Sequence, residues 1–457
     1  MAEKTPYLES KSHPYLARIA AKWLQGDSCV PVVRDSAGLW RFDGRVWKKL
    51  REGAACHAVM KFEHMPVASG YDEDKQTVIT KPMSLTHSNI VGIRNVLYGL
   101  KEIDQPDFFQ GAPSGLQFAN GFLSLEDNGE IKFEACSPKH RQRMFMDWDW
   151  DPEAKAPRFE QALDQWFEPK SIGNENFDVD QDAKEKVQFL QEFMGACLTG
   201  MATHFAKTAV LFGKGSNGKS AFIDAVMSVF PKGYTSAIDP QHMGQEYRAA
   251  QLEGKRINFA ADIPSHEIVS SSMLKAVITG DVVTARHIRQ DPFQFKPRAG
   301  HIFSANELPG TRDQSSGFWR RFVVVRFDNQ FGKENRDIHL AKKLEAEQKG
   351  IIAWMIRGVS RALQQGHYTI PASSENTTRD WKRESDVVAL WLEECTEEAQ
   401  TAALKTQGQR LWASFDSWRQ SNRYSPMGSR TFYRRLQNLV GKPQKTKTAR
   451  LYPLIII

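Results

Sequence analysis

The stretch LFGKGSNGKS, residues 211–220, decides the fold of this chain because it carries the complete pattern G-x-x-x-x-G-K-S. Glycines allow backbone angles that side chains forbid, so the N–H groups of such a loop can point inward at phosphate oxygens. Lys219 is expected to reach the outer phosphates, and Ser220 to ligate a magnesium ion. The residues predicted to hold the nucleotide are Gly213, Gly215, Ser216, Asn217, Gly218, Lys219 and Ser220.

The segments on both sides of this loop have the character that a phosphate-binding loop requires. KTAVLF (207–212) is an apolar run typical of a buried strand, and AFIDAVMSVF (221–230) has apolar residues at helical spacing. Strand and helix patterns then alternate as far as residue 327, which predicts a parallel α/β domain. Kinases, GTPases, transporter ATPases and helicases all contain such a loop, so the loop alone leaves the function open.

Composition narrows the class of protein. Hydrophobic residues make up 41% of the 457 residues, but they form no run near the roughly 20 residues that cross a bilayer. The first residues, MAEKTPYLESK, are polar and mixed in charge, so no signal peptide is expected. The five cysteines form no close pair, which argues against a disulfide framework or a zinc knuckle. These features predict a soluble intracellular protein without a membrane partner.

The net charge of +7 is unevenly distributed along the chain. Residues 401–457 contain eleven basic residues and one acid, Asp416, a net charge of +10, so residues 1–400 sum to −3. Such asymmetry predicts a C-terminal module that meets a polyanion. The alternative is a basic, solvated surface that only improves solubility.

Within this basic segment, SRTFYRRLQNLVG (429–441) reads as a helix, with Ser429 as the N-cap candidate. Phe432, Leu436, Leu439 and Val440 would form its buried stripe. KPQKTKTARLYPLIII (442–457) then predicts a basic wing and a terminal strand. The residues expected to contact DNA here are Arg430, Arg434, Arg435, Lys445 and Lys447.

Acidic and amide side chains follow two later strands of the predicted sheet. GKRINFAAD (254–262) ends in Asp262, which is expected to ligate magnesium and to hold the attacking water; Glu267 is the alternative acid. AGHIFSANELP (299–309) ends in Asn306, which can orient that water or sense the terminal phosphate. The alternative roles are a turn residue for Asp262 and a strand cap for Asn306.

Basic residues occupy two further positions. GFWRRFVVVRF (317–327) puts Arg320 and Arg321 directly before an apolar strand, where an arginine can project onto the nucleotide of a neighbouring subunit. Between the second and third strands, Lys275 lies on a predicted short helix. VVTARHIRQDPFQF (282–295) then reads as a hairpin. Its tip would carry the DNA-gripping residues Arg286, His287 and Arg289.

Taken in order, GKGSNGKS, INFAAD, LKAVITGD…ARHIRQDPFQF, HIFSANELP and WRRFVVVRF resemble a superfamily 3 AAA+ helicase. More narrowly, the chain resembles the phage/plasmid primase family, whose relatives include satellite-phage alpha-type proteins and poxvirus primase-helicases. FANGFLSLEDNGEI…CSPKHR…DWDPEAKAPRFEQALDQWF is similar to the accessory domain that precedes the ATPase in that family.

The resemblance implies roles for individual residues. Lys219 and Ser220 fill the Walker A positions, Asp262 the Walker B acid and Asn306 sensor 1. Arg321 falls on the arginine finger, with Arg320 as the close alternative, and Lys275 on a basic position that faces a neighbour's phosphates. One departure is Ala261-Asp262, where the family often has a glutamate or two adjacent acids.

It also implies the ligands and the assembly. The expected ligands are ATP and Mg²⁺, and the expected assembly is a homo-hexamer that moves 3′ to 5′ on single-stranded DNA in a central pore. The expected compartment is the cytoplasm of a bacterial host cell. Duplex origin DNA is a further partner that the basic C-terminal module would bind. A separate primase is another, because the first ~190 residues show neither an acidic triad nor a zinc ribbon for priming.

The predicted fold class is α/β, with an AAA+ P-loop core, an N-terminal α+β accessory domain and a C-terminal winged helix. PASSENTTRD (371–380) is expected to be a linker or turn, and no catalytic constellation is found in the N-terminal third. The predicted domains are 1–150 (accessory), 151–200 (helical collar), 201–345 (ATPase), 346–384 (helical lid and linker) and 385–457 (winged helix).

Two other functions remain open from the sequence. An origin-binding replication initiator would use nucleotide for assembly and not for processive unwinding. A P-loop kinase of small molecules would be a monomer, and the basic hairpin at 282–295 argues against it.

Overall fold

We analysed a computed structural model of the chain. The structure describes residues 7–26, 30–35, 37–51, 53–170, 176–263, 271–311, 313–332, 334, 337, 339–401, 404–424, 426–446 and 449–457.

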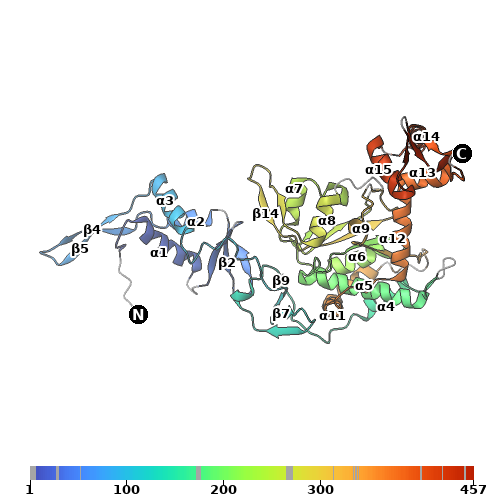
Figure 1. The fold of residues 1–457 in the computed structure, drawn as a ribbon. Helices are drawn as coiled ribbons and strands as arrows, with labels where there is room; N and C mark the ends of the chain where they lie inside the picture. Colours follow the sequence, from blue (N-terminus) through green and yellow to red (C-terminus); the bar gives the residue numbers. More distant parts are fainter. Residues whose placement is uncertain are drawn as a thin grey trace. The chain divides into compact units, whose positions relative to one another are not determined.

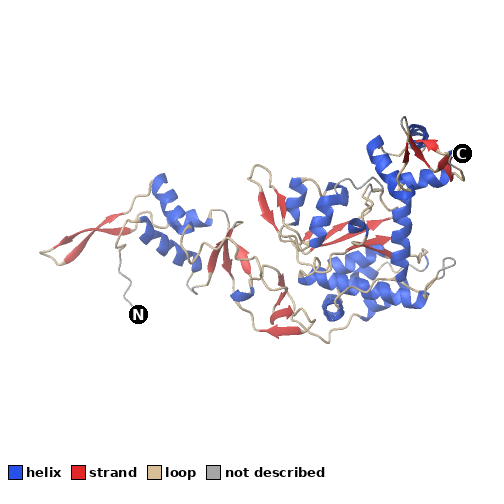
Figure 2. Cartoon of the chain, viewed as in Figure 1, coloured by secondary structure: helices blue, strands red, loops and turns tan. Residues whose placement is uncertain are grey.

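The chain divides into two compact units, residues 1–152 and 153–457 (Figure 1). Each unit contains both helices and strands (Figure 2). Within the described residues, no helix is long and apolar enough to cross a membrane.

Within its described residues, the first unit, residues 1–152, contains α1, α2 and α3, a short 3₁₀ helix at Pro138–His140, a three-stranded sheet, a two-stranded ribbon and a four-stranded sheet. One side of the three-stranded sheet packs on the helices through Val32 and Leu39. The elements are α1 (His13–Gln25), β1 (Val32–Asp35), β2 (Gly38–Phe42), β3 (Trp47–Lys49), α2 (Ala54–Met60), β4 (Pro66–Asp72), β5 (Thr77–Pro82), α3 (His87–Tyr98), β6 (Gly115–Phe118), β7 (Gly121–Leu125), β8 (Ile131–Glu134) and β9 (Phe145–Met146).

The second unit contains the predicted parallel α/β sheet, which is confirmed. Its order is β11-β12-β15-β10-β16, and all four pairings are parallel. The strand that leads into the glycine loop therefore lies between the last two strands of the sheet in chain order, and all five strands end at the same edge. The strands are β10 (Thr208–Phe212), β11 (Thr235–Ser236), β12 (Ile257–Ala260), β15 (Gly300–Ala305) and β16 (Phe322–Arg326).

Helices cover both faces of this sheet. Figure 1 shows helices on both sides of these strands. Val210, Phe303 and Val324 pack on the side of α8, and Gly300 faces α5, where an added Cβ would lie 2.2 Å from Cys197 Sγ. The remaining elements up to residue 384 are α4 (Pro157–Trp166), α5 (Val179–Thr199), α6 (Lys219–Met227), α7 (Glu246–Ala249), α8 (Ser271–Thr279), β13 (Val283–Ala285), β14 (Phe293–Phe295), α9 (Ser316–Trp319), α10 (Leu340–Glu345), α11 (Gln348–Gln365) and α12 (Ala372–Glu384).

The prediction of a linker at 371–380 was wrong, because these residues form most of α12. Serine and threonine disfavour helix interiors when their side chains compete for backbone groups. In this helix one such side chain is engaged by the adjacent strand β16, because Ser374 Oγ accepts a hydrogen bond from Val324 N at 2.8 Å. Trp381, 2% exposed, then anchors the helix in the core.

The C-terminal part of the second unit is a small helix-and-sheet module with its own core around Trp391, Phe415 and Phe432. Helix 429–440 begins at Ser429, but its N-cap is Gly428, so Ser429 is not the cap. Leu439 is 38% exposed, so only part of the predicted stripe is buried, while Val440 packs against the margin of this small core. The elements are α13 (Val387–Cys395), β17 (Thr396–Glu398), β18 (Thr406–Gln407), α14 (Gly408–Ser421), α15 (Ser429–Val440), β19 (Gln444–Lys445), β20 (Arg450–Tyr452) and β21 (Leu454–Ile456).

A buried histidine in the central sheet makes folding sensitive to acid. His301 on β15 is fully buried, and burial lowers its pKa from 6.5 to about 4. Between these two values the unfolded chain binds a proton that the folded chain does not. We therefore expect this residue to lower the free energy of unfolding by up to about 3 kcal/mol as the pH falls from 6.5 to 4.

The measurement is thermal unfolding of the wild type and of His301→Phe at several pH values in that range. The variant should lose less stability on acidification than the wild type does. The exposed His87, changed to phenylalanine, is the matched control. Equal acid sensitivity of His301→Phe and the wild type would contradict the expectation.

Candidate functional site

The glycine loop between β10 and α6 has the backbone that its sequence predicts. Gly213 and Gly218 have φ values of 153° and 95°, a region that favours glycine. A Cβ on Gly218 would lie 2.4 Å from Cδ1 of Trp166, at the end of α4, and a Cβ on Gly213 would lie 2.5 Å from Phe327 O. Both glycines are therefore required by conformation and by space.

The loop is fastened to the strands beside it. Asn217 Nδ2 donates to Phe327 O at 3.0 Å, and Phe331 N donates to Ser216 O at 2.8 Å. On the other side, Gly213 N donates to Ala305 O at 3.3 Å. These bonds hold the loop open, with Gly215, Ser216 and Ser220 exposed along its mouth.

Lys219 lies at the centre of the site and is 6% exposed. Its Nζ contacts Gly213 O and lies 3.3 Å from Asn306 Oδ1, directly after β15. Burial lowers the pKa of Lys219, and the charge of Asp262 opposes that shift. The structure thus brings together Lys219, Asn306 and Asp262 at the carboxyl ends of three adjacent strands.

Asp262 follows β12 on an unusual backbone. Its φ is 45°, and its side chain is exposed. The next residue anchors the turn, because Ile263 N donates to Ser304 O at 2.9 Å. The alternative acid, Glu267, lies outside the described residues.

Arg320 and Arg321 lie at the amino-terminal ends of the strands, whereas Lys219, Asn306 and Asp262 lie at the carboxyl-terminal ends. They precede β16, whose first residue pairs with Thr208 at the start of β10, and Thr208 N donates to Arg321 O at 2.7 Å. A five-residue strand spans roughly 16 Å, so neither arginine is brought together with Lys219 in the same chain.

Arg321 and Lys275 share an acidic neighbourhood. Lys275 Nζ lies 2.8 Å from Asp313 Oδ2, and Arg321 Nη1 donates to Gly317 O. Burial and then the charge of Arg320 lower the pKa of Arg321, while Asp281 and Asp313 oppose this shift. Asp313 carried no signal in the sequence, since it is one acid in a loop.

The predicted hairpin is present as β13 and β14. Arg286 folds back onto α7, where Nη2 donates to Tyr247 Oη at 2.9 Å, and the ring of His287 stacks on Phe293 at 5.0 Å. Arg289 is exposed at the tip with φ 61°. Ile288 is 76% exposed beside it, an apolar tip residue that charge-based reasoning missed.

The predicted DNA contacts of the C-terminal module differ in their surroundings. Arg430 and Arg434 on α15 and Lys445 on β19 are exposed. Arg435 is half-buried and held by Asp386, 5% exposed, with Nε 2.8 Å from Oδ2. Lys447 lies outside the described residues. No group of three or more His, Cys, Asp or Glu residues that could hold a metal is found in the described part of the chain.

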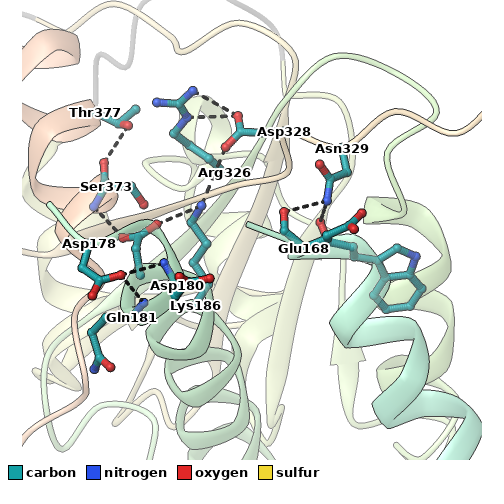
Figure 3. A network of polar contacts seen from close by, with 12 residues as sticks. Glu168, Asp178, Asp180, Gln181, Lys186, Arg326, Asp328, Asn329, Ser373 and Thr377 are labelled. Atoms are coloured by element: carbon teal, nitrogen blue, oxygen red, sulfur yellow. Dashed lines mark hydrogen bonds and ion pairs between the residues drawn. The ribbon is translucent and has the colours of Figure 1, made fainter. Parts of the chain in front are cut away.

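A buried polar network lies beside the loop (Figure 3). Lys186 Nζ lies 3.0 Å from Asp182 Oδ2 and 3.7 Å from Asp328 Oδ2, and Arg326 contacts the same Asp328 at 3.1 Å. Asn329 Nδ2 donates to three carbonyl oxygens at the end of α4, those of Gln165, Trp166 and Glu168, at 3.1, 3.3 and 3.1 Å. The network joins α5, α12 and the segment after β16 to the helix that covers Gly218.

Asp182→Ala is expected to destabilise the second unit by about 3 kcal/mol. Asp182 is 3% exposed; its loss removes a partner of the buried Lys186 and the acceptor for Ser373 N, a bond of 2.7 Å. Thermal unfolding measures the effect. Asp180→Ala, at an exposed position in the first turn of the same helix, is the control. An unchanged melting temperature in Asp182→Ala would show that the network contributes no stability.

Two family models match parts of the chain. Residues 17–168 match the family model described as D5 N terminal like, and residues 211–321 match a family of unknown function, DUF5906. The protein named "Putative helicase" of Acanthamoeba polyphaga mimivirus is 24% identical over 210 residues. That match covers 44% of this chain and 20% of the mimivirus protein, so the chain spans about a fifth of that relative's length.

Solved structures of the NrS-1 C-terminal region align over nearly the whole chain. Two apo forms cover 98% and 97% of this chain and 100% of theirs, with 12% sequence identity and TM-scores of 0.43 and 0.44. At that distance the likeness assigns no residue.

Proposed function

We propose that this chain is an ATP-dependent, ring-forming replicative DNA helicase of a phage, satellite or mobile element, with an AAA+ core and a C-terminal winged helix. The observation that carries the proposal is the meeting of Lys219, Asn306 and Asp262 at one edge of a parallel sheet, with Arg320 and Arg321 at the other. The basic hairpin of β13 and β14, with Arg289 exposed at its tip, argues against a small-molecule kinase.

The residues of the loop fit ATP and Mg²⁺. The loop N–H groups and Lys219 would bind the phosphates, and the exposed Ser220 and Asp262 would hold magnesium. When bound, magnesium neutralises phosphate charge. Asn306, already within 3.3 Å of Lys219 Nζ, would orient the attacking water with Asp262.

The position of the arginines supports an assembly of several copies, which we propose to be a ring. Arg321, with Arg320 as the close alternative, can meet a nucleotide only in a neighbouring subunit, and Lys275 lies in the same acidic neighbourhood. A homo-hexamer is the assembly that the family resemblance implies. Each nucleotide would then lie between two copies of the chain.

Single-stranded DNA would pass through the centre of that ring. Arg289 and Ile288 at the exposed hairpin tip offer a charge and an apolar contact. Arg286, also in the hairpin, holds it against α7 by donating to Tyr247 Oη. The 3′-to-5′ direction is carried over from the resemblance. The mimivirus protein named as a helicase and the D5 N terminal like match support a replication role.

An origin-binding initiator is the second candidate. The exposed Arg430 and Arg434 on α15 favour it, because a helix with free arginines on its outer side can contact duplex DNA. An initiator would hydrolyse ATP during assembly and would not separate long duplexes.

The decisive experiment measures ATP hydrolysis with and without single-stranded DNA, together with strand separation on a forked duplex. The helicase proposal expects DNA to stimulate hydrolysis and hydrolysis to drive strand separation. DNA-independent hydrolysis, or tight binding to one duplex sequence without unwinding, would replace it with the initiator.

A further inference from the structure

Two short segments of the first unit, far apart in sequence, are unusually basic. Residues 41–51 and 139–143 together contain eight basic residues and a single acid, Asp43. No other segment of this unit concentrates positive charge in this way, whereas residues 147–151 carry three acids and no base. The basic residues are Arg41, Arg45, Lys48, Lys49, Arg51, Lys139, Arg141 and Arg143.

The fold places these segments side by side. Trp47 N, at the start of β3, donates to Gln142 O at 2.8 Å, and Trp47 Nε1 donates to Pro138 O at 3.0 Å. Cys136 Sγ lies 3.2 Å from Arg45 O in the turn between β2 and β3. These contacts hold the two basic segments next to each other, although the mutual repulsion of their charges opposes the arrangement.

Three of the arginines lie over aromatic rings. The guanidinium carbon of Arg45 is 5.1 Å from the ring centre of Phe145, that of Arg141 is 5.5 Å from Phe108, and that of Arg143 is 4.9 Å from Phe109. All three rings are half-buried. Guanidinium and aromatic planes arranged in this way are the groups on which unpaired bases stack.

The rings form a rigid base for these cations. The ring centres of Trp47 and Phe108, Phe108 and Phe109, and Trp40 and Phe109 lie 4.7, 5.0 and 4.9 Å apart. Because Lys49 pairs with Trp40 across the β2–β3 ladder, both side chains leave the sheet on the same face. Lys49 therefore joins the same surface.

Acids also lie near this surface. Asp107 lines the same hollow as Phe108 and Arg141 and accepts a hydrogen bond from Gln110 Nε2 at 2.6 Å. Asp43 lies 2.6 Å from Lys48 Nζ and accepts hydrogen bonds from Arg45 N and Val46 N, and Glu134 lies 3.0 Å from His140 Nε2. Among the described residues, no acidic side chain lies within ion-pair distance of Arg45 or Lys49, and both are exposed.

We propose that this surface, formed by Arg45, Lys49, Arg141 and Arg143 with Phe108, Phe109 and Phe145, binds single-stranded nucleic acid. We call it the arginine–aromatic face. The cations would contact phosphates, and the rings and guanidinium planes would stack with bases. The inference does not depend on the helicase proposal, because every residue belongs to the first unit. An acidic protein segment would meet the charges but would not use the stacked guanidinium and aromatic planes.

The test uses the full chain without nucleotide and measures fluorescence anisotropy of labelled (dT)20 and (U)20 over a series of salt concentrations. Arg45→Glu with Lys49→Glu is expected to weaken binding at least tenfold at low salt. The slope of log affinity against log salt should become less steep by about 1 to 2, since each lost phosphate contact removes about 0.7. Lys11→Glu with Lys81→Glu, two exposed lysines elsewhere in the unit, carries the same charge change and should alter binding less than twofold.

Crosslinking separates this surface from DNA sites in the second unit. An oligonucleotide containing 5-iododeoxyuridine, irradiated with the wild-type chain, should crosslink to peptides that contain Phe108, Phe109 or Phe145. The matching RNA probe contains 5-iodouridine. Equal crosslinking of the DNA and RNA probes supports recognition of any single strand, and a preference for one of them supports a site specific for that sugar. The proposal is overturned if no crosslink falls within residues 100–150, or if the paired glutamate variant binds like its lysine control.

Discussion

Lys219→Ala is expected to reduce ATP hydrolysis at least a hundredfold and to abolish strand separation. The side chain is buried in the loop, its Nζ within reach of Gly213 O and 3.3 Å from Asn306 Oδ1, where the outer phosphates would lie. A fixed charge aimed at a phosphoryl group in a site of low polarity contributes several kcal/mol to the transition state.

The measurement is steady-state phosphate release, with unwinding assayed on the same samples. Lys214→Ala is the matched control, because Lys214 belongs to the same loop but is exposed. Hydrolysis reduced equally in both variants would assign the effect to the net charge of the loop. Strand separation that survives Lys219→Ala would refute the motor.

Arg321→Ala is expected to abolish hydrolysis by the assembled protein while leaving ATP binding intact. Arg321 lies at the amino ends of the strands and Lys219 at the carboxyl ends, so one nucleotide can meet both only across a boundary between two chains. An arginine supplied in this way accelerates phosphoryl transfer by a factor of 10³–10⁵ in other NTPases.

A mixing experiment tests the geometry directly. Neither Lys219→Ala nor Arg321→Ala alone should hydrolyse ATP, but a mixed assembly contains boundaries at which an intact Lys219 meets an intact Arg321. With equal amounts and random assembly, about a quarter of the boundaries are complete, so measurable hydrolysis should return. The same mixture with Arg320→Ala in place of Arg321→Ala identifies which arginine acts. Only the variant of the active arginine should be inactive alone and recover hydrolysis when mixed with Lys219→Ala. A mixture that stays inactive, although both proteins assemble, would contradict the shared site.

Much of the catalytic edge could be predicted from the sequence. The loop, Asp262 and Asn306 each follow a short apolar strand, and parallel strands bring their carboxyl ends to one edge, so spacing alone predicts that these residues meet. The functions assigned to these residues stay predictions. The strand order is consistent with them, but it does not measure hydrolysis.

What could not be predicted depends on contacts between distant segments. Trp166 over Gly218 and Asp386 beside Arg435 join residues that no local pattern connects. The helix at 372–384 was missed because contacts with the folded core hold it, among them the bond from Val324 N to Ser374 Oγ and the burial of Trp381. The arginine–aromatic face went unnoticed for the same reason, since its two basic segments lie about ninety residues apart in the sequence.

Lys219 and Arg321 lie at opposite ends of the strands of one sheet, so under the proposed shared site the rate of ATP hydrolysis depends on assembly. If each chain holds one half of two different sites, an isolated copy is inert however much ATP surrounds it. Turnover per chain then rises with protein concentration and reaches a plateau only once assembly is complete. At low concentration the protein would therefore hydrolyse almost no ATP. Under the proposed helicase function, replication would start only above the protein concentration at which the copies assemble.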